Sequence, residues 1–164
     1  MSRAHREPRA CRNTVLAFAI ACALLPAIFA NAAAQGPFGL GVIVGEPTGV
    51  AAKYWLSNRT AFAGAVAWSF ADEGAFHIHG DYLWHYFDRV KVEKGRLPLY
   101  LGVGGRFKAV NDDALLGVRF PLGVCYLLEN APVDFFLEVV PLLDLAPETE
   151  LRGNAAFGFR YFFK

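Results

Sequence analysis

The chain has 164 residues, enough for one domain with a sizeable interior, and its 16 Lys and Arg nearly balance 15 Asp and Glu. Such a balance provides no basic field, which excludes a nucleic-acid-binding protein. Hydrophobic residues make up 55% of the sequence and charged residues only 19%, so the chain is more apolar than an average soluble domain. No apolar run of about 20 residues follows residue 34, so no transmembrane helix is expected there. An apolar soluble β fold or a membrane β-barrel remains.

The first 34 residues have the layout of a secretory signal peptide. Four arginines and one glutamate precede the apolar segment 14–30, and small residues follow it. We expect cleavage after Ala34, with cleavage after Ala32 as the alternative. The chain then consists of a signal peptide (1–34) and one further domain (35–164), which carries a net charge of about −2. An uncleaved anchor and a lipoprotein modified at Cys22 are weaker interpretations.

From residue 36 onward the sequence breaks into eight runs in which large apolar residues alternate with small or polar ones. The runs are 37–45, 49–57, 61–70, 75–87, 97–110, 115–128, 133–145 and 151–163. The segments between them are short and rich in turn-forming residues, so neighbouring runs are predicted to pair as antiparallel hairpins. Because proline cannot donate to a ladder, Pro98, Pro121 and Pro141 predict bulges or strand ends.

The two faces of these runs distinguish a membrane barrel from a soluble one. In 133–145, for example, one face carries large apolar side chains and the other carries Asp134, Glu138 and Asp144. The interior of eight strands is too narrow for all the large side chains, so the small and charged face is predicted to point inward and the apolar face toward lipid. We therefore expect an all-β fold, an eight-stranded antiparallel up-and-down transmembrane β-barrel after the signal peptide. A soluble periplasmic barrel of lipocalin type is the competing architecture.

The last run places aromatic residues on every second position, Phe157, Phe159, Tyr161 and Phe163, with Arg160 on the opposite face. This pattern resembles the C-terminal signal by which outer-membrane barrels are recognised for assembly. The expected partners are therefore outer-membrane lipids and, through the C-terminal strand, the barrel-assembly machinery. Aromatic residues near strand ends are expected to form interfacial girdles. They are Tyr54, Trp68, Phe70, Trp84, Tyr86 and Tyr126.

Four segments carry a resemblance to known proteins: GLGVIVGEPTGVAAKYWL, DYLWHYF, LPLYLGVGGR and GVRFPLGVCYLL. They resemble a family of small exported barrels in Gram-negative bacteria, and the mature chain is similar in size to the transmembrane domain of outer membrane protein A. The resemblance covers nearly all of 36–164. It implies a barrel fold and localisation in the bacterial outer membrane, and it implies no activity.

The inward-facing charges form the first candidate site. They are Lys53, Asp81, Arg106, Lys108, Arg119, Asp134, Glu138, Asp144, Arg152 and Arg160. Counting across the hairpins places Asp144 near Arg119 and Arg152, and Glu138 near the level of Arg160. Because an unpaired buried charge costs several kcal/mol, we expect a salt-bridged plug. A basic-lined pore for small anions is the alternative.

Three histidines, His77, His79 and His85, share the predicted inner face. A metal site at His77 and His79 is conceivable, but histidines hydrogen-bonded within a polar interior are the favoured interpretation, so no metal or other cofactor is expected. Counting places Ser69 across from His77, which makes a lipid-directed hydrolase using Ser69 and His77 the alternative function. Cys125, the one cysteine outside the signal peptide, faces inward as an inert buried thiol.

With both termini on the periplasmic side, the segments at the outer end are acidic. Their carboxylates are Glu46, Asp72, Glu73, Asp112, Asp113, Glu148 and Glu150. Solvated loops are expected, and a Ca²⁺ or Mg²⁺ site is the alternative. The sequence thus predicts a monomeric, non-enzymatic outer-membrane barrel with a polar, salt-bridged lumen, which serves envelope integrity or limited permeation of small solutes.

Overall fold

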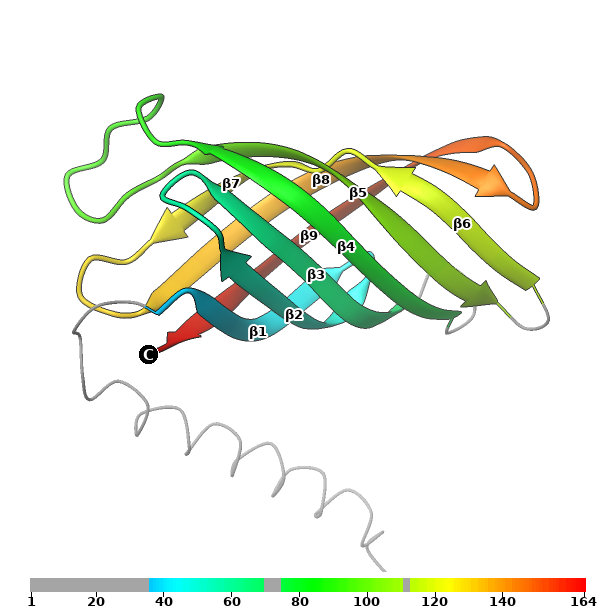
Figure 1. Ribbon diagram of the computed structural model, residues 1–164, viewed down its shortest axis with the longest axis horizontal. Coiled ribbons are helices and arrows are strands. Elements are labelled where there is room, and N and C mark those ends of the chain that lie inside the picture. Colours follow the sequence, from blue (N-terminus) through cyan, green and yellow to red (C-terminus); the bar gives the residue numbers. More distant parts are fainter. Residues whose placement is uncertain (1–35, 70–74, 111–112) are drawn as a thin grey trace, which may run out of the picture. The chain divides into compact units, whose positions relative to one another are not determined.

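The computed structural model describes residues 36–69, 75–110 and 113–164 (Figure 1). The predicted signal peptide with its cleavage sites lies outside the described residues, as do Phe70, Asp72, Glu73 and Asp112 and the side chains of Ser69 and Asp113. The strands are β1 (Phe38–Gly45), β2 (Thr48–Trp55), β3 (Thr60–Ser69), β4 (Ala75–Tyr86), β5 (Leu99–Val110), β6 (Asp113–Arg119), β7 (Leu122–Leu127), β8 (Val133–Ala146) and β9 (Glu150–Phe163). Among the described residues, no helix is long and apolar enough to cross a membrane.

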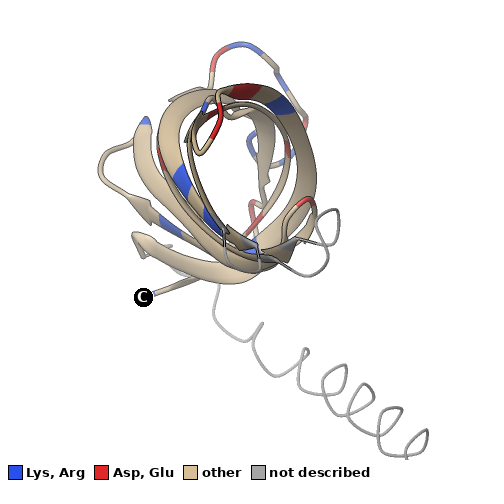
Figure 2. Cartoon of the chain, turned by 90° about the vertical axis from the view of Figure 1, so that its right-hand side faces the viewer, with Lys and Arg blue, Asp and Glu red and all other residues tan. Residues whose placement is uncertain are grey.

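The strands close into one antiparallel ring. They follow the order β4-β3-β2-β1-β9-β8-β6-β5, and pairing of β4 with β5 closes the circle (Figure 2). Strands β6 and β7 together occupy one position, because both pair with β5 on one side and β8 on the other. The ring therefore has eight positions, which confirms the predicted all-β, eight-stranded antiparallel barrel.

The predicted run 115–128 is interrupted at Phe120 and Pro121, which separate β6 from β7. Pro121 cannot donate a ladder hydrogen bond, in agreement with the prediction. The prediction for Pro141 is wrong, because β8 continues through it. The Pro141 carbonyl accepts a hydrogen bond from the Phe120 N–H at 3.0 Å, so Pro141 lies opposite the break between β6 and β7. The N–H that proline lacks would point to this break, where the ladder of hydrogen bonds is already interrupted. Pro98 lies just before β5, at a strand end as expected.

The outer wall is apolar. In β8, Phe135, Leu137 and Val139 are 49%, 56% and 54% exposed, whereas Phe136 and Val140 on the opposite face are buried. The other strands repeat this arrangement, and Tyr54, Trp68, Trp84 and Tyr86 are exposed near their ends. A soluble barrel of lipocalin type needs the opposite arrangement. The wall therefore has the apolar-out pattern of a transmembrane barrel.

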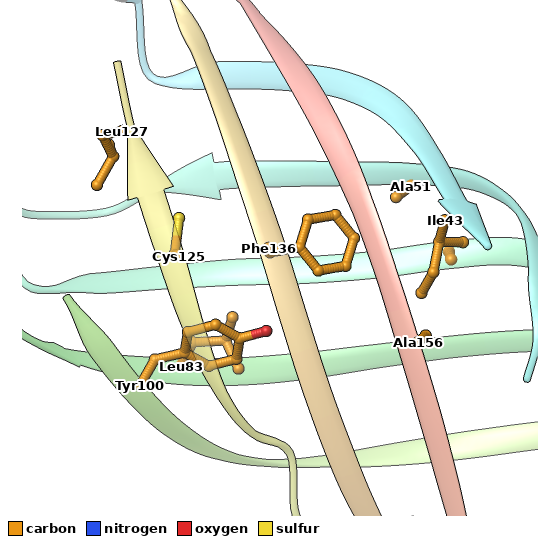
Figure 3. Packing of buried hydrophobic residues seen from close by; sticks show 9 residues of the cluster. Ile43, Ala51, Leu83, Tyr100, Cys125, Leu127, Phe136 and Ala156 are labelled. Carbon is orange, nitrogen blue, oxygen red and sulfur yellow. The ribbon is translucent and has the colours of Figure 1, made fainter. Parts of the chain in front are cut away.

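The interior contains apolar as well as polar side chains, although a largely polar filling was predicted. Buried residues from several strands form a cluster, shown in Figure 3, which comprises Ile43, Ala51, Ala65, Leu83, Tyr100, Cys125, Leu127, Phe136 and Ala156. The ring of Phe162 also points inward and packs over Gly39, where an added Cβ would lie 2.9 Å from it. Aromatic rings therefore share the narrow interior with the charges.

The first and last strands meet at a seam. Strand β1 pairs along its full length with 156–163 of β9. On its other side β9 pairs with β8 over 150–161. The register with β1 thus ends six residues short of the start of β9.

Candidate functional site

The structure places nine of the ten charges predicted for the lumen in the interior as buried side chains, and Arg152 is half-buried at the end of the barrel far from the C-terminus. All of them except Lys108, which lies near Glu46, gather in three groups along β8, each built around one of its carboxylates. We call them the near cluster (Lys53, Asp134, Arg160), the middle cluster (Asp81, Arg119, Glu138) and the far cluster (Arg106, Asp144, Arg152), according to distance from the C-terminus.

In the near cluster one carboxylate contacts two cations. Asp134 accepts hydrogen bonds from Arg160 Nε at 2.9 Å and Nη2 at 3.1 Å, and its Oδ2 lies 3.5 Å from Lys53 Nζ. The same Nζ lies 2.9 Å from His85 Nε2 and 4.0 Å from Cys125 Sγ. Strands β2 and β7, which carry Lys53 and Cys125, occupy opposite positions of the ring. The Lys53 side chain therefore crosses the interior.

In the middle cluster one guanidinium joins two acidic side chains. Arg119, which is fully buried, donates from Nε to Asp81 Oδ1 at 2.9 Å and from Nη2 to Glu138 Oε1 at 3.4 Å. The Tyr100 hydroxyl donates to the other oxygen of Glu138 at 2.9 Å. The predicted proximity of Glu138 to Arg160 is wrong, because the register of β8 and β9 places Asp134, not Glu138, opposite Arg160.

In the far cluster Arg106 donates from Nε to Asp144 Oδ1 at 2.9 Å and from Nη2 to both carboxylate oxygens. Arg152 Nε lies 3.4 Å from Asp144 Oδ2. The predicted proximity of Asp144 to Arg119 is wrong, because Asp144 stands at the level of Gly117 and Arg119 at the level of Leu142. The principal partner of Asp144 is therefore Arg106.

Glycines lie beneath three of these polar contacts. Gly104 stands opposite both Asp81 and Arg119, and an added Cβ there would overlap the Asp81 carboxylate. Gly117 lies in the same way between Arg106 and Asp144, where an added Cβ would be 2.5 Å from the carboxylate. Gly123 lies between Tyr100 and Glu138. Each glycine provides the space through which side chains of the two flanking strands meet, a pattern that sequence reasoning missed.

The three histidines are buried in the interior among its polar side chains. His79 Nδ1 lies 3.3 Å from His77 Nε2, and His79 Nε2 lies 3.8 Å from Asp81 Oδ2. Within the described ranges, no group of three or more His, Cys, Asp or Glu is arranged to hold a metal ion.

The register of β3 and β4 places Ala67 opposite His77 and Ser69 opposite Ala75, so the predicted Ser69–His77 juxtaposition is wrong. The ladder is aligned by outward pairs such as Trp68 and Phe76.

Two described carboxylates of the acidic rim, Glu46 and Glu150, lie close to cations. Glu46 Oε1 is 3.7 Å from Lys108 Nζ, and Glu150 accepts a hydrogen bond from Arg152 Nη2 at 2.7 Å. Glu148 is exposed, whereas Asp72, Glu73 and Asp112 and the side chain of Asp113 lie outside the described part of the chain. The predicted calcium or magnesium alternative stays a prediction.

No protein-family model and no curated protein matches the sequence. Among solved structures, the chain is similar to the crystal structure of the N-terminal β-barrel domain of Pseudomonas aeruginosa OprF, with a TM-score of 0.63 and 12% sequence identity. The match covers 79% of this chain and 100% of that domain. At this identity the similarity establishes a common fold and leaves function open. The chain therefore has the fold of the OprF N-terminal barrel, with an interior crossed by buried ion pairs.

Proposed function

We propose that this chain is an outer-membrane β-barrel that is sealed by its own side chains and that contributes to envelope integrity without catalysing a reaction. The apolar wall supports insertion into a bilayer, where a closed barrel satisfies all its backbone hydrogen bonds. The basic start, apolar middle and small-residue end of 1–34 support export. Extraction only by detergent, together with heat-modifiable migration on a gel, would test the membrane-barrel part of the proposal.

The main observation in favour of a sealed barrel is the position of Lys53. From β2, its ammonium reaches His85 on β4, Cys125 on β7 and Asp134 on β8, and only 1% of the residue is exposed. The middle cluster adds a second obstruction, because Arg119 is 0% exposed. A continuous aqueous passage would expose some surface of these groups. Separating them would leave charges unpaired in a narrow interior, at a cost of several kcal/mol.

Single-channel recording in planar bilayers tests this proposal. We expect the refolded native protein to give no conductance steps, and the Lys53→Ala/Arg119→Ala double variant to give steps because two obstructions are removed. Arg59→Ala is the matched control, because the exposed Arg59 side chain pairs with Asp88 at 3.5 Å outside the lumen. Steady anion-selective steps in the native protein would contradict sealing and would instead establish limited permeation through a basic-lined pore.

A further inference from the structure

The connection between β4 and β5, residues 87–98, is the longest one between the described strands. It lies at the same end of the barrel as the C-terminus (Figure 1). Outer-membrane barrels commonly have short turns at their periplasmic end and long loops at the outer end. With both termini in the periplasm, the orientation that the sequence predicts, this chain has the reverse arrangement, so the connection calls for an explanation beyond joining two strands.

The segment 88–96, which we call the basic loop, carries four exposed cations, Arg89, Lys91, Lys94 and Arg96. Its acidic residues are Asp88 and Glu93, and Asp88 lies 3.5 Å from Arg59 Nη2 of the neighbouring turn. Within the described part of the chain, no ion pair involves Arg89, Lys91 or Lys94. The basic loop therefore presents net positive charge to its surroundings.

The loop is held in place by the barrel. Arg96 and Leu127 exchange backbone hydrogen bonds of 3.0 and 2.8 Å, and the Tyr126 hydroxyl donates to the Lys94 carbonyl at 3.2 Å. The Arg96 guanidinium also lies 5.2 Å from the centre of the Phe87 ring. These contacts hold the part of the loop around Lys94 and Arg96 at a defined level relative to the outer wall.

That level is the edge of the apolar wall. The chain leaves the wall after Tyr86 and rejoins it at Leu99, two side chains that are 44% and 40% exposed. Figure 1 shows the connection extending past the end of the barrel at which the C-terminus lies, and Figure 2 shows it outside the ring. In a bilayer this position coincides with the lipid headgroups, and the 38%-exposed Val92 lies between Lys91 and Glu93.

We propose that the basic loop binds the headgroups of anionic phospholipids in the leaflet at the end of the barrel where the C-terminus lies. The proposal rests on the proposed function, because it requires a barrel inserted in a bilayer. Clustered Lys and Arg next to a membrane-spanning segment attract anionic lipid, with a contribution of about 1 kcal/mol per cation, equivalent to about fivefold in affinity.

The tryptophans allow a test at both ends of the barrel. Trp84 lies on the outer wall beside the basic loop, Trp68 lies at the opposite end, and Trp55 points into the interior. Trp55→Phe/Trp68→Phe leaves Trp84, and Trp55→Phe/Trp84→Phe leaves Trp68. Each variant is reconstituted in phosphatidylcholine vesicles containing phosphatidylglycerol, with either lipid brominated to quench fluorescence. We expect a preference for phosphatidylglycerol of about fivefold or more at Trp84 and none at Trp68.

Substitution within the loop completes the test. Arg89→Gln/Lys91→Gln/Lys94→Gln should abolish the preference at Trp84, whereas the matched change Glu93→Gln should retain or increase it. Equal preference at the two tryptophans, or a preference that survives the triple substitution, would overturn the inference alone. Absence of quenching by brominated phosphatidylcholine at both tryptophans would overturn the proposed function as well. Absence of lipid preference, with peptidoglycan binding that the triple variant loses, would assign the loop to that polymer instead and overturn the lipid proposal.

Discussion

At the scale of single residues, Arg119 shows how this barrel accommodates a buried charge. Its guanidinium is the shared partner of Asp81 and Glu138. Burying a charge is costly, and the cost is offset only while its partners remain in place. Removing the arginine would therefore do more than delete two contacts, because it would leave two carboxylates facing each other in a closed interior.

We expect Arg119→Ala to lower the free energy of unfolding by about 3–5 kcal/mol, the range observed when one member of a buried ion pair is removed. Urea titration of the vesicle-inserted protein, followed by tryptophan fluorescence, would measure the change. Arg59→Ala should leave the midpoint unchanged, because its pair with Asp88 is exposed. If the two variants unfold at the same urea concentration, the middle cluster contributes nothing to stability.

The sequence predicts which side chains face inward but not which of them pair. Side-chain parity along a strand is local, so the inward position of Asp144 and Arg119 could be deduced from alternation. The identity of a partner depends on the register across two or three strands. The bulge near Leu116 and Gly117 shifts that register, and the same uncertainty misplaced Ser69 relative to His77.

At the scale of elements, the glycines beneath the ion pairs connect strands that are not direct neighbours. Strands β4 and β6 are separated by β5, yet Asp81 and Arg119 meet because Gly104 lies between them. The outward-facing Gly80 provides a contrast, since an added Cβ there would meet nothing within 4 Å. Two glycines of neighbouring strands therefore differ in function according to the face on which they lie.

We expect Gly104→Ala to destabilise the barrel by about 1–3 kcal/mol, because the added Cβ would overlap both the Asp81 carboxylate and the backbone carbonyl of Gly80, so that side chain and backbone must shift. Gly80→Ala, which adds the same methyl group on the lipid side, should change stability by less than about 0.5 kcal/mol. The difference between their urea midpoints is the measurement. Equal effects of the two substitutions would show that backbone conformation, rather than space beneath the ion pair, determines the glycine requirement.

At the scale of the whole molecule, the apolar wall is the feature that supports folding in a membrane. The same alternation that places charges inside places large side chains outside on every strand, and this regularity made the architecture predictable from sequence. The interruption at Pro121 was also predictable, whereas the continuity through Pro141 was not, since it depends on the strand facing it. The function of the barrel was harder to predict from the sequence, because a filled interior consists of the same residue types as a conducting one.

A charged side chain introduced on the outer wall should destabilise the barrel more strongly the deeper it lies in the membrane. Val139 lies midway along β8 and is 54% exposed, whereas Leu151 lies at the outer end of β9 and is 76% exposed. We expect Val139→Arg to cost about 2–4 kcal/mol of folding free energy in lipid vesicles and Leu151→Arg about 1 kcal/mol or less. Reversible unfolding in vesicles would measure both. Similar costs at the two positions would argue against a barrel that spans the bilayer.

The seam between β1 and β9 has a consequence for the order of assembly. Most pairs in the ring join strands that follow one another in the chain, but this pair joins the two ends of the described domain, so its loop-closure entropy is the largest. The ladder that offsets this entropy is shorter than the one between β8 and β9. Closure is therefore expected to be the last step of folding. Until it occurs, both edges carry unpaired backbone groups, which lipid cannot solvate, so for the proposed membrane barrel we expect insertion and closure to proceed together.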